Sequence, residues 1–426
     1  MNILMMTNTF TPHVGGVARS IERFSHRYRE LGHHVMVIAP EFDGMPEAEP
    51  NVVRIPAVRH FNHTDFSVAL PIPHRLNRAV ERFRPQVVHS HHPFLVGGTA
   101  MRVAHTLKLP LVFTHHTRYE DYTHNVPGDS PLLKRFVKNL ATNYANLCDQ
   151  VFVPSQSIQT IIRNRGVTSP VNVVPTGVDP DAFAKGERSN TRQSLGIPDD
   201  AFVIGHLGRL TREKNLPFLI ESIIACMCSA AMSRPVHCLI YGSGPLEQFV
   251  LSQFDTAGLS EYLHLPGVVD EDELADAYHA MDVFAFASTS ETQGMVLTEA
   301  MASGVPVVAI DASGVREVLD DGVNGHLLPG AVVRDFADAL ASIAALNAAG
   351  YAQLQQGARQ TAERFSMEKT ASTALALYAG LLRRHLPERQ DDYSVWSEAV
   401  AVVESEWELV KSTARSAIDA LDTSEG

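Results

Sequence analysis

Short apolar runs alternate with longer amphipathic stretches along the first half of the chain. The runs are rich in Val, Ile, Leu and Met, whereas the stretches between them carry apolar residues at helical spacing. Alternation of this kind is typical of a parallel sheet with helices on both faces. The predicted strands are residues 2–6, 34–39, 87–89, 111–114, 150–153 and 171–174, and the predicted helices include residues 17–31, 74–83, 97–107 and 131–146.

A second alternation of the same kind follows a polar stretch. Its predicted strands are residues 202–207, 237–241, 263–265, 283–287 and 307–310, with helices that begin near 216 and 245 and span 271–280 and 295–302. A chain of this length is expected to form two domains. We therefore predict an α/β fold of two Rossmann-like, doubly wound domains that face a central cleft. Its parts are an N-terminal domain (1–183), a linker (184–200), a second domain (201–366), a helix that crosses back to the first domain (367–386) and an acidic extension (387–426).

The charge of the chain is uneven. The net charge of −13 argues against nucleic acid as a partner. Residues 1–180 hold 18 Lys and Arg against 13 Asp and Glu, so the N-terminal half is basic and is expected to meet something anionic. Residues 387–426 hold 10 acidic and 3 basic residues, and form either an amphipathic acidic helix or a partly disordered tail.

Composition indicates a cytoplasmic protein. No apolar run approaches the roughly 18 residues of a membrane-spanning helix. The first apolar run has no basic residues before it, so we expect a buried strand there instead of a signal peptide. The spacing of the four cysteines is that of neither a disulfide framework nor a zinc site, and buried reduced thiols are expected.

Two glutamates frame one strand-to-helix loop. Glu291 follows the predicted strand 283–287, and Glu299 lies inside the predicted helix 295–302, which Gly304 and the proline at 306 terminate. Such loops bind ligands in open parallel sheets, and a helix N-terminus attracts phosphate. Carboxylates at both ends of the loop suit an anion that carries hydroxyls, such as a nucleotide sugar. The alternative is that Glu299 is a helix-surface acid and Glu291 an exposed loop residue.

Cations and glycines occupy other strand-to-helix loops. Arg209 and Lys214 share a Gly-bearing loop after strand 202–207, and two fixed cations can stabilise a departing diphosphate without a metal. A solvated surface cluster is the alternative. Gly15 and Gly16 after the first strand, and Gly242 and Gly244 after strand 237–241, permit close approach of a ligand or form plain turns. The dinucleotide pattern Gly-x-Gly-x-x-Gly does not occur, which counts against a nicotinamide enzyme.

Histidines gather after two neighbouring strands of the first half. His91 follows strand 87–89, and His116 follows strand 111–114, with three more histidines at 89, 92 and 115. Strand alternation sends neighbouring side chains to opposite faces, and no helical His-x-x-x-His occurs, so a metal site is disfavoured. A hydrogen-bonding histidine in the cleft is favoured over a purely structural one.

The order of these motifs resembles glycosyltransferase family 4, the retaining enzymes with the GT-B fold. The resemblance covers nearly all of residues 1–385 and includes Pro154-Ser155 between the N-terminal and C-terminal motifs. Two segments resemble the branch that glycosylates diacylglycerol: Glu-Thr-Gln-Gly at 291–294 and His-Thr-Arg-Tyr-Glu-Asp-Tyr-Thr-His at 116–124. One position departs from the family, because Thr176 stands where an Asn often begins an Asn-Gly-Val-Asp segment.

The resemblance implies a hexosyltransferase that uses a nucleotide-diphosphate sugar, with UDP favoured, and a lipid hydroxyl such as that of diacylglycerol. No cofactor or metal is required. The alternatives are a soluble carbohydrate or cell-envelope polysaccharide acceptor, a non-catalytic nucleotide-sugar-binding protein, and a GT-B phosphorylase or epimerase. Implied catalytic residues are His116, Arg209, Lys214 and Glu291; donor-binding residues are Gly15, Gly16, Arg209, Lys214, Gly242, Gly244, Val269, Glu291, Gln293, Gly294, Met295, Val296 and Glu299; acceptor-side residues are His91, His116, Tyr119 and Asp121.

Two predicted helices of the N-terminal half combine basic and apolar residues. One places Arg75, Arg78 and Arg82 on one face, and the other carries Lys134, Arg135 and Lys138 beside leucines and Phe136. A basic amphipathic helix can dock on an anionic leaflet. We therefore expect peripheral contact with the inner face of the cytoplasmic membrane, against the alternative of helices with one core face and one solvated face.

Overall fold

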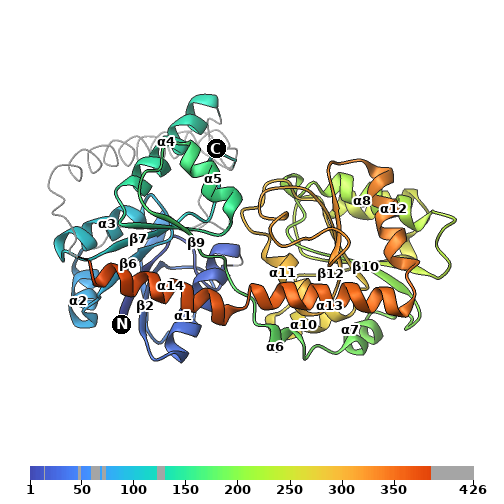
Figure 1. Cartoon of the computed structure of the whole chain (residues 1–426), viewed down its shortest axis with the longest axis horizontal. Helices are drawn as coiled ribbons and strands as arrows, with labels where there is room; N and C mark the ends of the chain where they lie inside the picture. The colour runs from blue at the N-terminus through green and yellow to red at the C-terminus, as the bar shows by residue number, and fades with distance from the viewer. Residues whose placement is uncertain (14, 47–48, 59–67, 70–72, 122–129, 385–426) are drawn as a thin grey trace, which may run out of the picture. The chain divides into compact units, whose positions relative to one another are not determined.

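The computed structural model describes residues 1–13, 15–46, 49–58, 68–69, 73–121 and 130–384 (Figure 1). The chain forms two compact units. Unit 1 contains the described residues of Met1–Phe152, Ile162–Asn172 and the chain from Ala376 on, and unit 2 contains Val153–Ile161 and Val173–Leu375. The predicted acidic extension, 387–426, lies outside the described residues, as do the last two residues of the predicted crossing helix.

Unit 1 is built on a parallel sheet whose strand order is β3-β2-β1-β6-β7-β8-β9. The order reverses between β1 and β6, so the loops that leave these strands flank the switch point where ligands bind in doubly wound sheets. The strands are β1 (Asn2–Met6), β2 (His34–Pro40), β3 (Val52–Ile55), β6 (Val87–Ser90), β7 (Leu111–Thr114), β8 (Gln150–Val153) and β9 (Val171–Val173). A separate antiparallel pair joins β4 (Ala57–Val58) and β5 (Val68–Ala69).

The helices of unit 1 follow from local sequence signals. Helix α4 (Pro131–Asn146), for example, begins with Ser130, whose hydroxyl accepts a hydrogen bond from the N–H of Leu133, and has a proline in its first turn. The other helices of the N-terminal half are α1 (Gly16–Glu30), α2 (Pro73–Phe83), α3 (Val96–Thr106) and α5 (Gln156–Asn164), of which α5 begins in unit 2.

Unit 2 repeats the architecture, with the strand order β12-β11-β10-β13-β14-β15 and parallel pairings throughout. Its switch point lies between β10 and β13, so the loops 208–215 and 287–294 are neighbours. The strands are β10 (Phe202–Leu207), β11 (Val236–Tyr241), β12 (Leu263–Gly267), β13 (Val283–Phe286), β14 (Val307–Ile310) and β15 (Gly325–Leu328). These two sheets confirm the predicted α/β fold of two Rossmann-like parts.

Two apolar cores cover the faces of the unit 2 sheet. On one face α8 packs against α12, and on the other α11 packs against α13 (Figure 1). The helices are α6 (Pro180–Phe183), α7 (Arg188–Ser194), α8 (Leu216–Met227), α9 (Glu247–Thr256), α10 (Leu274–His279), α11 (Met295–Ala302), α12 (Val333–Ala344) and α13 (Ala348–Arg364). Three short 3₁₀ turns are η3 (Arg212–Lys214), η4 (Ser260–Tyr262) and η5 (Glu271–Glu273).

The boundaries between the units differ from the predicted ranges. Residues 153–161 and 173–183 belong to unit 2, because Ser155 and Thr176 hydrogen-bond to the loop at Thr292 and Gln293. The segment 184–200, predicted as a linker, contains α7 and packs into unit 2. The last helix, α14 (Met367–Leu382), contributes to both units, and Tyr378 hydrogen-bonds to His89 in unit 1 at 2.7 Å.

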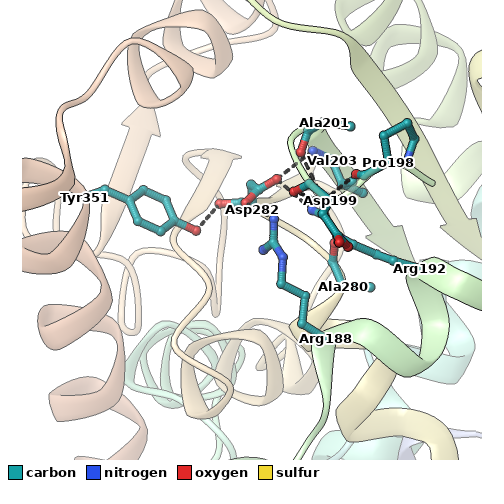
Figure 2. A network of polar contacts seen from close by, with 9 residues as sticks. All are labelled: Arg188, Arg192, Pro198, Asp199, Ala201, Val203, Ala280, Asp282 and Tyr351. Carbon is teal, nitrogen blue, oxygen red and sulfur yellow. Dashed lines mark hydrogen bonds and ion pairs between the residues drawn. The ribbon is translucent and has the colours of Figure 1, made fainter.

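A buried ion pair anchors α7 to unit 2 (Figure 2). The fully buried Arg192 guanidinium donates to Asp282 at 2.9 Å and to the carbonyls of Pro198, Asp199, Ala201 and Ala280. The same carboxylate accepts from the N–H of Val203 on β10 at 2.8 Å. Each nitrogen of the Arg192 guanidinium thus has an acceptor, and the other carboxylate oxygen of Asp282 pairs with Arg188 at 3.0 Å. Such partners are the condition under which a buried pair is stable.

Candidate active site

The loop between β13 and α11 holds the first predicted glutamate and an open helix start. Gly294 precedes the helix with φ 73° and ψ 58°, a left-handed conformation that favours glycine. Helix α11 has no side-chain N-cap hydrogen bond and no acidic residue in its first turn. The N–H of Leu297 donates to the carbonyl of Gly294 at 2.9 Å, whereas the N–H groups of Met295 and Val296 are available to an anion such as phosphate.

Lys214 and Glu291 form an ion pair across the switch point of unit 2. Lys214 ends η3 in the loop after β10, and Glu291 lies in the loop after β13. Their side chains are 18% and 17% exposed, so the pair is partly shielded from water. The structure therefore brings together two residues to which the sequence assigned catalytic roles.

Arg209 lies in a different environment from Lys214. Its side chain is 57% exposed and pairs with Glu213 four residues on, at 2.7 Å. An exposed pair of this kind contributes little to stability, roughly 0–1 kcal/mol, so its exchange for a ligand contact costs little. Lys214 and Arg209 thus differ: the lysine is half-buried at the glutamate, and the arginine lies on the surface.

Glu299 is buried within α11 and is not a surface acid. One oxygen of its carboxylate accepts a hydrogen bond from the hydroxyl of Tyr278 at 2.9 Å. Tyr278 lies on α10 and is itself buried against Phe183 and Phe284. This tyrosine fixes the orientation of the glutamate, and the alternative of a helix-surface carboxylate at position 299 is wrong.

Gly242 and Gly244 allow the loop after β11 to pack against the loop after β10 in unit 2. A side chain at Gly242 would strike the carbonyl of Gly208, and one at Gly244 would strike the carbonyl of Leu210. The two loops are joined by backbone hydrogen bonds from Gly208 to Tyr241 and from Leu210 to Ser243, at 3.0 and 2.9 Å. These glycines therefore set the backbone conformation of residues 208–215, which we call the cationic loop. The side chain of Val269 is buried in the core, so only its backbone could face a base.

His206 is a polar residue beneath the cationic loop that sequence reasoning did not select. Its Nδ1 lies 3.0 Å from the carbonyl of Ala285, and because a carbonyl only accepts, Nδ1 carries the proton. Nε2 is then an acceptor, buried and without a hydrogen-bond partner among the described residues, on the side of Gly208. Burial lowers the pKa of His206 to about 4, so the ring is neutral.

Three histidines of unit 1 form a neutral cluster, in which His89 and His91 are buried and His116 is partly exposed. The Nδ1 of His91 lies 2.9 Å from the Nε2 of His116, and the rings stack with centroids 5.2 Å apart. His89 lies between the hydroxyls of Thr114 and Tyr378, at 2.6 and 2.7 Å. Burial lowers the pKa of His89 to about 3 and lowers the pKa values of His91 and His116 well below the usual range. One ring of the His91–His116 pair must therefore donate and the other accept.

The side-chain groups that bind metal ions in proteins combine His, Cys, Asp and Glu. Among the residues that the structure describes, no group of three or more His, Cys, Asp or Glu side chains is arranged to hold a metal ion.

The remaining acceptor-side residues lie close to the histidines in the sequence. Tyr119 is buried with its ring against those of Phe94 and His115. Asp121 is partly buried and pairs with Arg118 at 3.2 Å. Burial raises the pKa of Asp121, and the arginine opposes that shift. Residues 122–124 of the segment used for the lipid resemblance lie outside the described residues.

Gly15 and Gly16 open helix α1 after β1. Gly15 is the N-cap residue in an extended conformation, and the helix has neither a side-chain cap nor an acidic residue in its first turn. A side chain at Gly16 would meet open space. This second open helix start lies at the carboxyl end of the unit 1 sheet, as His91 and His116 do.

Both halves of the chain match models of glycosyltransferases. The model described as Glycosyltransferase Family 4 matches residues 14–182, and the model described as Glycosyl transferases group 1 matches residues 201–345. Similar curated proteins include two α-monoglucosyldiacylglycerol synthases. That of Acholeplasma laidlawii is 30% identical over 341 residues, which cover 76% of this chain and 84% of the relative. That of Streptococcus pneumoniae is 28% identical over 344 residues, which cover 78% and 76%.

A third curated relative and one solved structure are also similar to this chain. A GDP-mannose-dependent α-mannosyltransferase of Mycobacterium tuberculosis is 30% identical over 340 residues, covering 77% of this chain and 84% of the relative. The crystal structure of Anabaena Alr3699/HepE in complex with UDP superposes with a TM-score of 0.70 at 22% identity, covering 89% of this chain and 100% of the other. This likeness confirms the predicted GT-B fold.

Proposed function

The chain belongs to glycosyltransferase family 4, and on that premise we propose that it moves a hexose from a nucleotide-diphosphate sugar to a lipid hydroxyl such as that of diacylglycerol. The observation that carries the proposal is the Lys214–Glu291 pair beside the open N-terminus of α11. A cation, a carboxylate and bare N–H groups converge there, which suits a diphosphate joined to a polyhydroxylated ring. The names of the two glycolipid synthases support the lipid acceptor.

The donor is held by unit 2 in this proposal. The α11 N–H groups bind a phosphate oxygen, and Lys214 neutralises the charge that develops on the leaving diphosphate. Glu291 accepts a hydrogen bond from a sugar hydroxyl, and Glu299 accepts from the ribose hydroxyls. Arg209 joins the diphosphate by leaving its exposed partner Glu213. UDP is favoured as the nucleotide because HepE, which shares the fold, has been crystallised with UDP.

The residues of unit 1 serve the acceptor and the reacting sugar. His116 contacts the sugar or the incoming hydroxyl, with His91, Tyr119 and Asp121 on the acceptor side. The bond from the anomeric carbon to the phosphate oxygen breaks while the bond from the acceptor oxygen forms on the same face. The acceptor proton passes to the leaving phosphate oxygen, so no protein base is required and the configuration is retained. This differs from the two-carboxylate scheme of glycosidases.

The proposal is tested by release of nucleoside diphosphate from UDP- and GDP-sugars, with and without diacylglycerol in mixed micelles. We expect release from one UDP-sugar that rises strongly when the lipid is present, and an α-anomeric product by NMR. Release that is indifferent to the lipid but stimulated by a soluble sugar would transfer the proposal to that acceptor. Donor binding without release from any sugar would favour a non-catalytic binding protein. Release of nucleoside diphosphate from GDP-mannose and from no UDP-sugar would show that the donor nucleotide is GDP instead of UDP.

Membrane contact is assigned to helix α4 on the basis of exposed apolar side chains. Leu132 and Phe136, one turn apart, are 77% and 44% exposed, and Lys134 and Arg135 are exposed beside them. In α2, by contrast, Leu76 and Val80 are buried, as in an ordinary helix with a core face. No helix within the described ranges has the length and apolar content needed to cross a bilayer. We therefore propose peripheral docking on the inner leaflet through α4.

The double variant Leu132→Ser/Phe136→Ser is expected to bind vesicles that contain anionic lipid about tenfold or more weakly than the wild-type protein. Partial insertion of two large apolar side chains contributes on the order of a kcal/mol each. Flotation at low salt measures the bound fraction. The matched control is Leu251→Ser, which removes an exposed leucine of α9 in unit 2. Equal binding by the double variant and the wild-type protein would remove α4 from the docking surface.

A further inference from the structure

Three hydrogen bonds hold the short segment between Glu291 and helix α11. The hydroxyl of Ser155 donates to the carbonyl of Thr292 at 2.8 Å. The side-chain oxygen of Gln293 accepts from the N–H of Thr176 at 2.7 Å, and its side-chain NH₂ donates to the carbonyl of the same Thr176 at 2.6 Å. Ser155, Thr176 and Gln293 are all buried, so these bonds are shielded from water. The loop that carries Glu291 is therefore fixed from two sides.

The residues that hold the loop are themselves well anchored within unit 2. The carboxylate of Glu317 accepts from the N–H groups of Gln156 and Ser157, at 2.6 Å each, which fixes the chain just after Ser155. On the Thr176 side, the N–H of Val178 donates to Phe365 at 3.0 Å, and the N–H of Met367 donates to Val178 at 2.7 Å. We call the hydrogen bonds of Ser155 and Thr176 to residues 292–293 the clamp. The clamp thus connects the loop to two fixed segments of backbone.

The backbone of Gly314 lies close to the backbone of Gln293 and fills the space behind the loop. Gly314 has φ +78°, and a side chain added there would lie 2.8 Å from the backbone nitrogen of Gln293 and 2.9 Å from its Cα. Only glycine allows the chain to come this close. The backbone of Gln293 therefore has little room to move away from Thr176.

From these contacts we propose that the Gln293 side chain is a positioning residue that sets Glu291 and the first turn of α11 for the sugar and diphosphate of the donor. The proposal rests on the proposed function. At neutral pH the primary amide of glutamine presents one acceptor and one donor side by side, as the N–H and C=O of Thr176 require, whereas an ionised carboxylate only accepts. Displacements of about 1 Å at such a site can cost about 10²-fold in rate. Glu299 lies further along α11 and is held by Tyr278, so the nucleoside end of the donor is positioned independently.

Gln293→Met and Gln293→Glu test the clamp. Methionine keeps the length of the side chain and removes both hydrogen bonds, whereas a carboxylate keeps the acceptor and faces the carbonyl of Thr176 with an unprotonated oxygen. We expect kcat/KM for sugar transfer to fall by about 10-fold to 10²-fold at neutral pH in both variants. Binding of uridine, which carries no phosphate, is measured by calorimetry and is expected to change by less than about threefold, because Glu299 and Tyr278 are untouched.

The pH dependence separates positioning from a general loss of structure. A protonated carboxylic acid donates and accepts as the amide does, so the activity of Gln293→Glu relative to wild type is expected to rise as the pH falls. Gln293→Met has no such group and is expected to show no rise. The matched control is Gln150→Glu in unit 1, where another buried amide donates to a backbone carbonyl, that of Pro170, at 3.1 Å. This control is expected to lose stability while its kcat/KM per folded molecule stays that of wild type.

Hydrogen exchange gives a result that does not depend on the reaction. The amides of residues 291–296 are expected to exchange faster in Gln293→Met than in the wild-type protein, and at the wild-type rate in Gln150→Glu. Unchanged exchange in this segment, or a loss of activity that matches a loss of uridine binding, would overturn the clamp. A wild-type protein that transfers no sugar, with exchange altered as expected, would instead refute the proposed function and leave the clamp standing.

Discussion

Lys214→Met is expected to lower turnover by about 10²-fold or more, because the substitution removes a preorganised charge from the leaving diphosphate. The half-buried Lys214 is held by Glu291, so its charge is ordered before the donor binds. Arg209→Ala is expected to act in the same direction with a smaller effect, since the exposed guanidinium must first be ordered. Initial rates at saturating donor and acceptor measure both effects.

The matched control for Arg209 is Arg334→Ala. Arg334 pairs with Asp338 four residues on, as Arg209 pairs with Glu213, and its side chain is exposed on α12. This variant is expected to keep full turnover. Full turnover in Arg209→Ala would exclude that arginine from the diphosphate site. Full turnover in Lys214→Met would contradict the assignment of the cationic loop altogether.

Asp282→Asn is expected to destabilise unit 2 by about 3–5 kcal/mol, the usual cost of leaving a buried charge, here Arg192, without its partner. Arg192→Met is expected to act in the same direction with a smaller loss, because Asp282 keeps a second partner, Arg188, at 3.0 Å. Arg192 is fully buried, and its carboxylate partner also holds the N–H of Val203 on β10. Chemical denaturation measures the loss, and hydrogen exchange of the β10 amides assigns it to unit 2.

An exposed pair of the same geometry provides the control. Arg364 and Asp320 also lie 2.9 Å apart, but their side chains are 56% and 49% exposed. Arg364→Met is therefore expected to cost no more than about 1 kcal/mol. Equal losses for the buried and the exposed arginine would show that the Figure 2 network contributes no more than a surface contact.

The alternation of apolar runs predicted the strands well because a strand of a doubly wound sheet is buried on both faces and leaves a local signal. The predicted strand 202–207 has the same bounds as β10, and the predicted helix 17–31 differs from α1 by one residue at each end. Strands β3 and β15, at the sheet edges, were not predicted. The helix α7 was taken as linker because its sequence is polar, and its anchor is a single buried arginine.

The residues of the candidate site were predictable only where they lie close together in the sequence, within one strand-to-helix loop. Glu291, Gly294 and Glu299 lie within nine consecutive positions, and their roles could be inferred from a strand, a turn and a helix. Tyr278, His206 and Thr176 could not be found in that way. The hydrogen bond between Thr176 and Gln293, for example, joins residues 117 positions apart and leaves no local pattern.

Transfer of radiolabelled sugar from a UDP-sugar to diacylglycerol tests the central claim most directly. After incubation in mixed micelles, the organic phase is extracted and its label is compared with the UDP released. The account predicts label in a glycolipid in an amount equal to the UDP, and loss of that label in Lys214→Met. UDP release with all of the label in the aqueous phase, or no release at all, would contradict it.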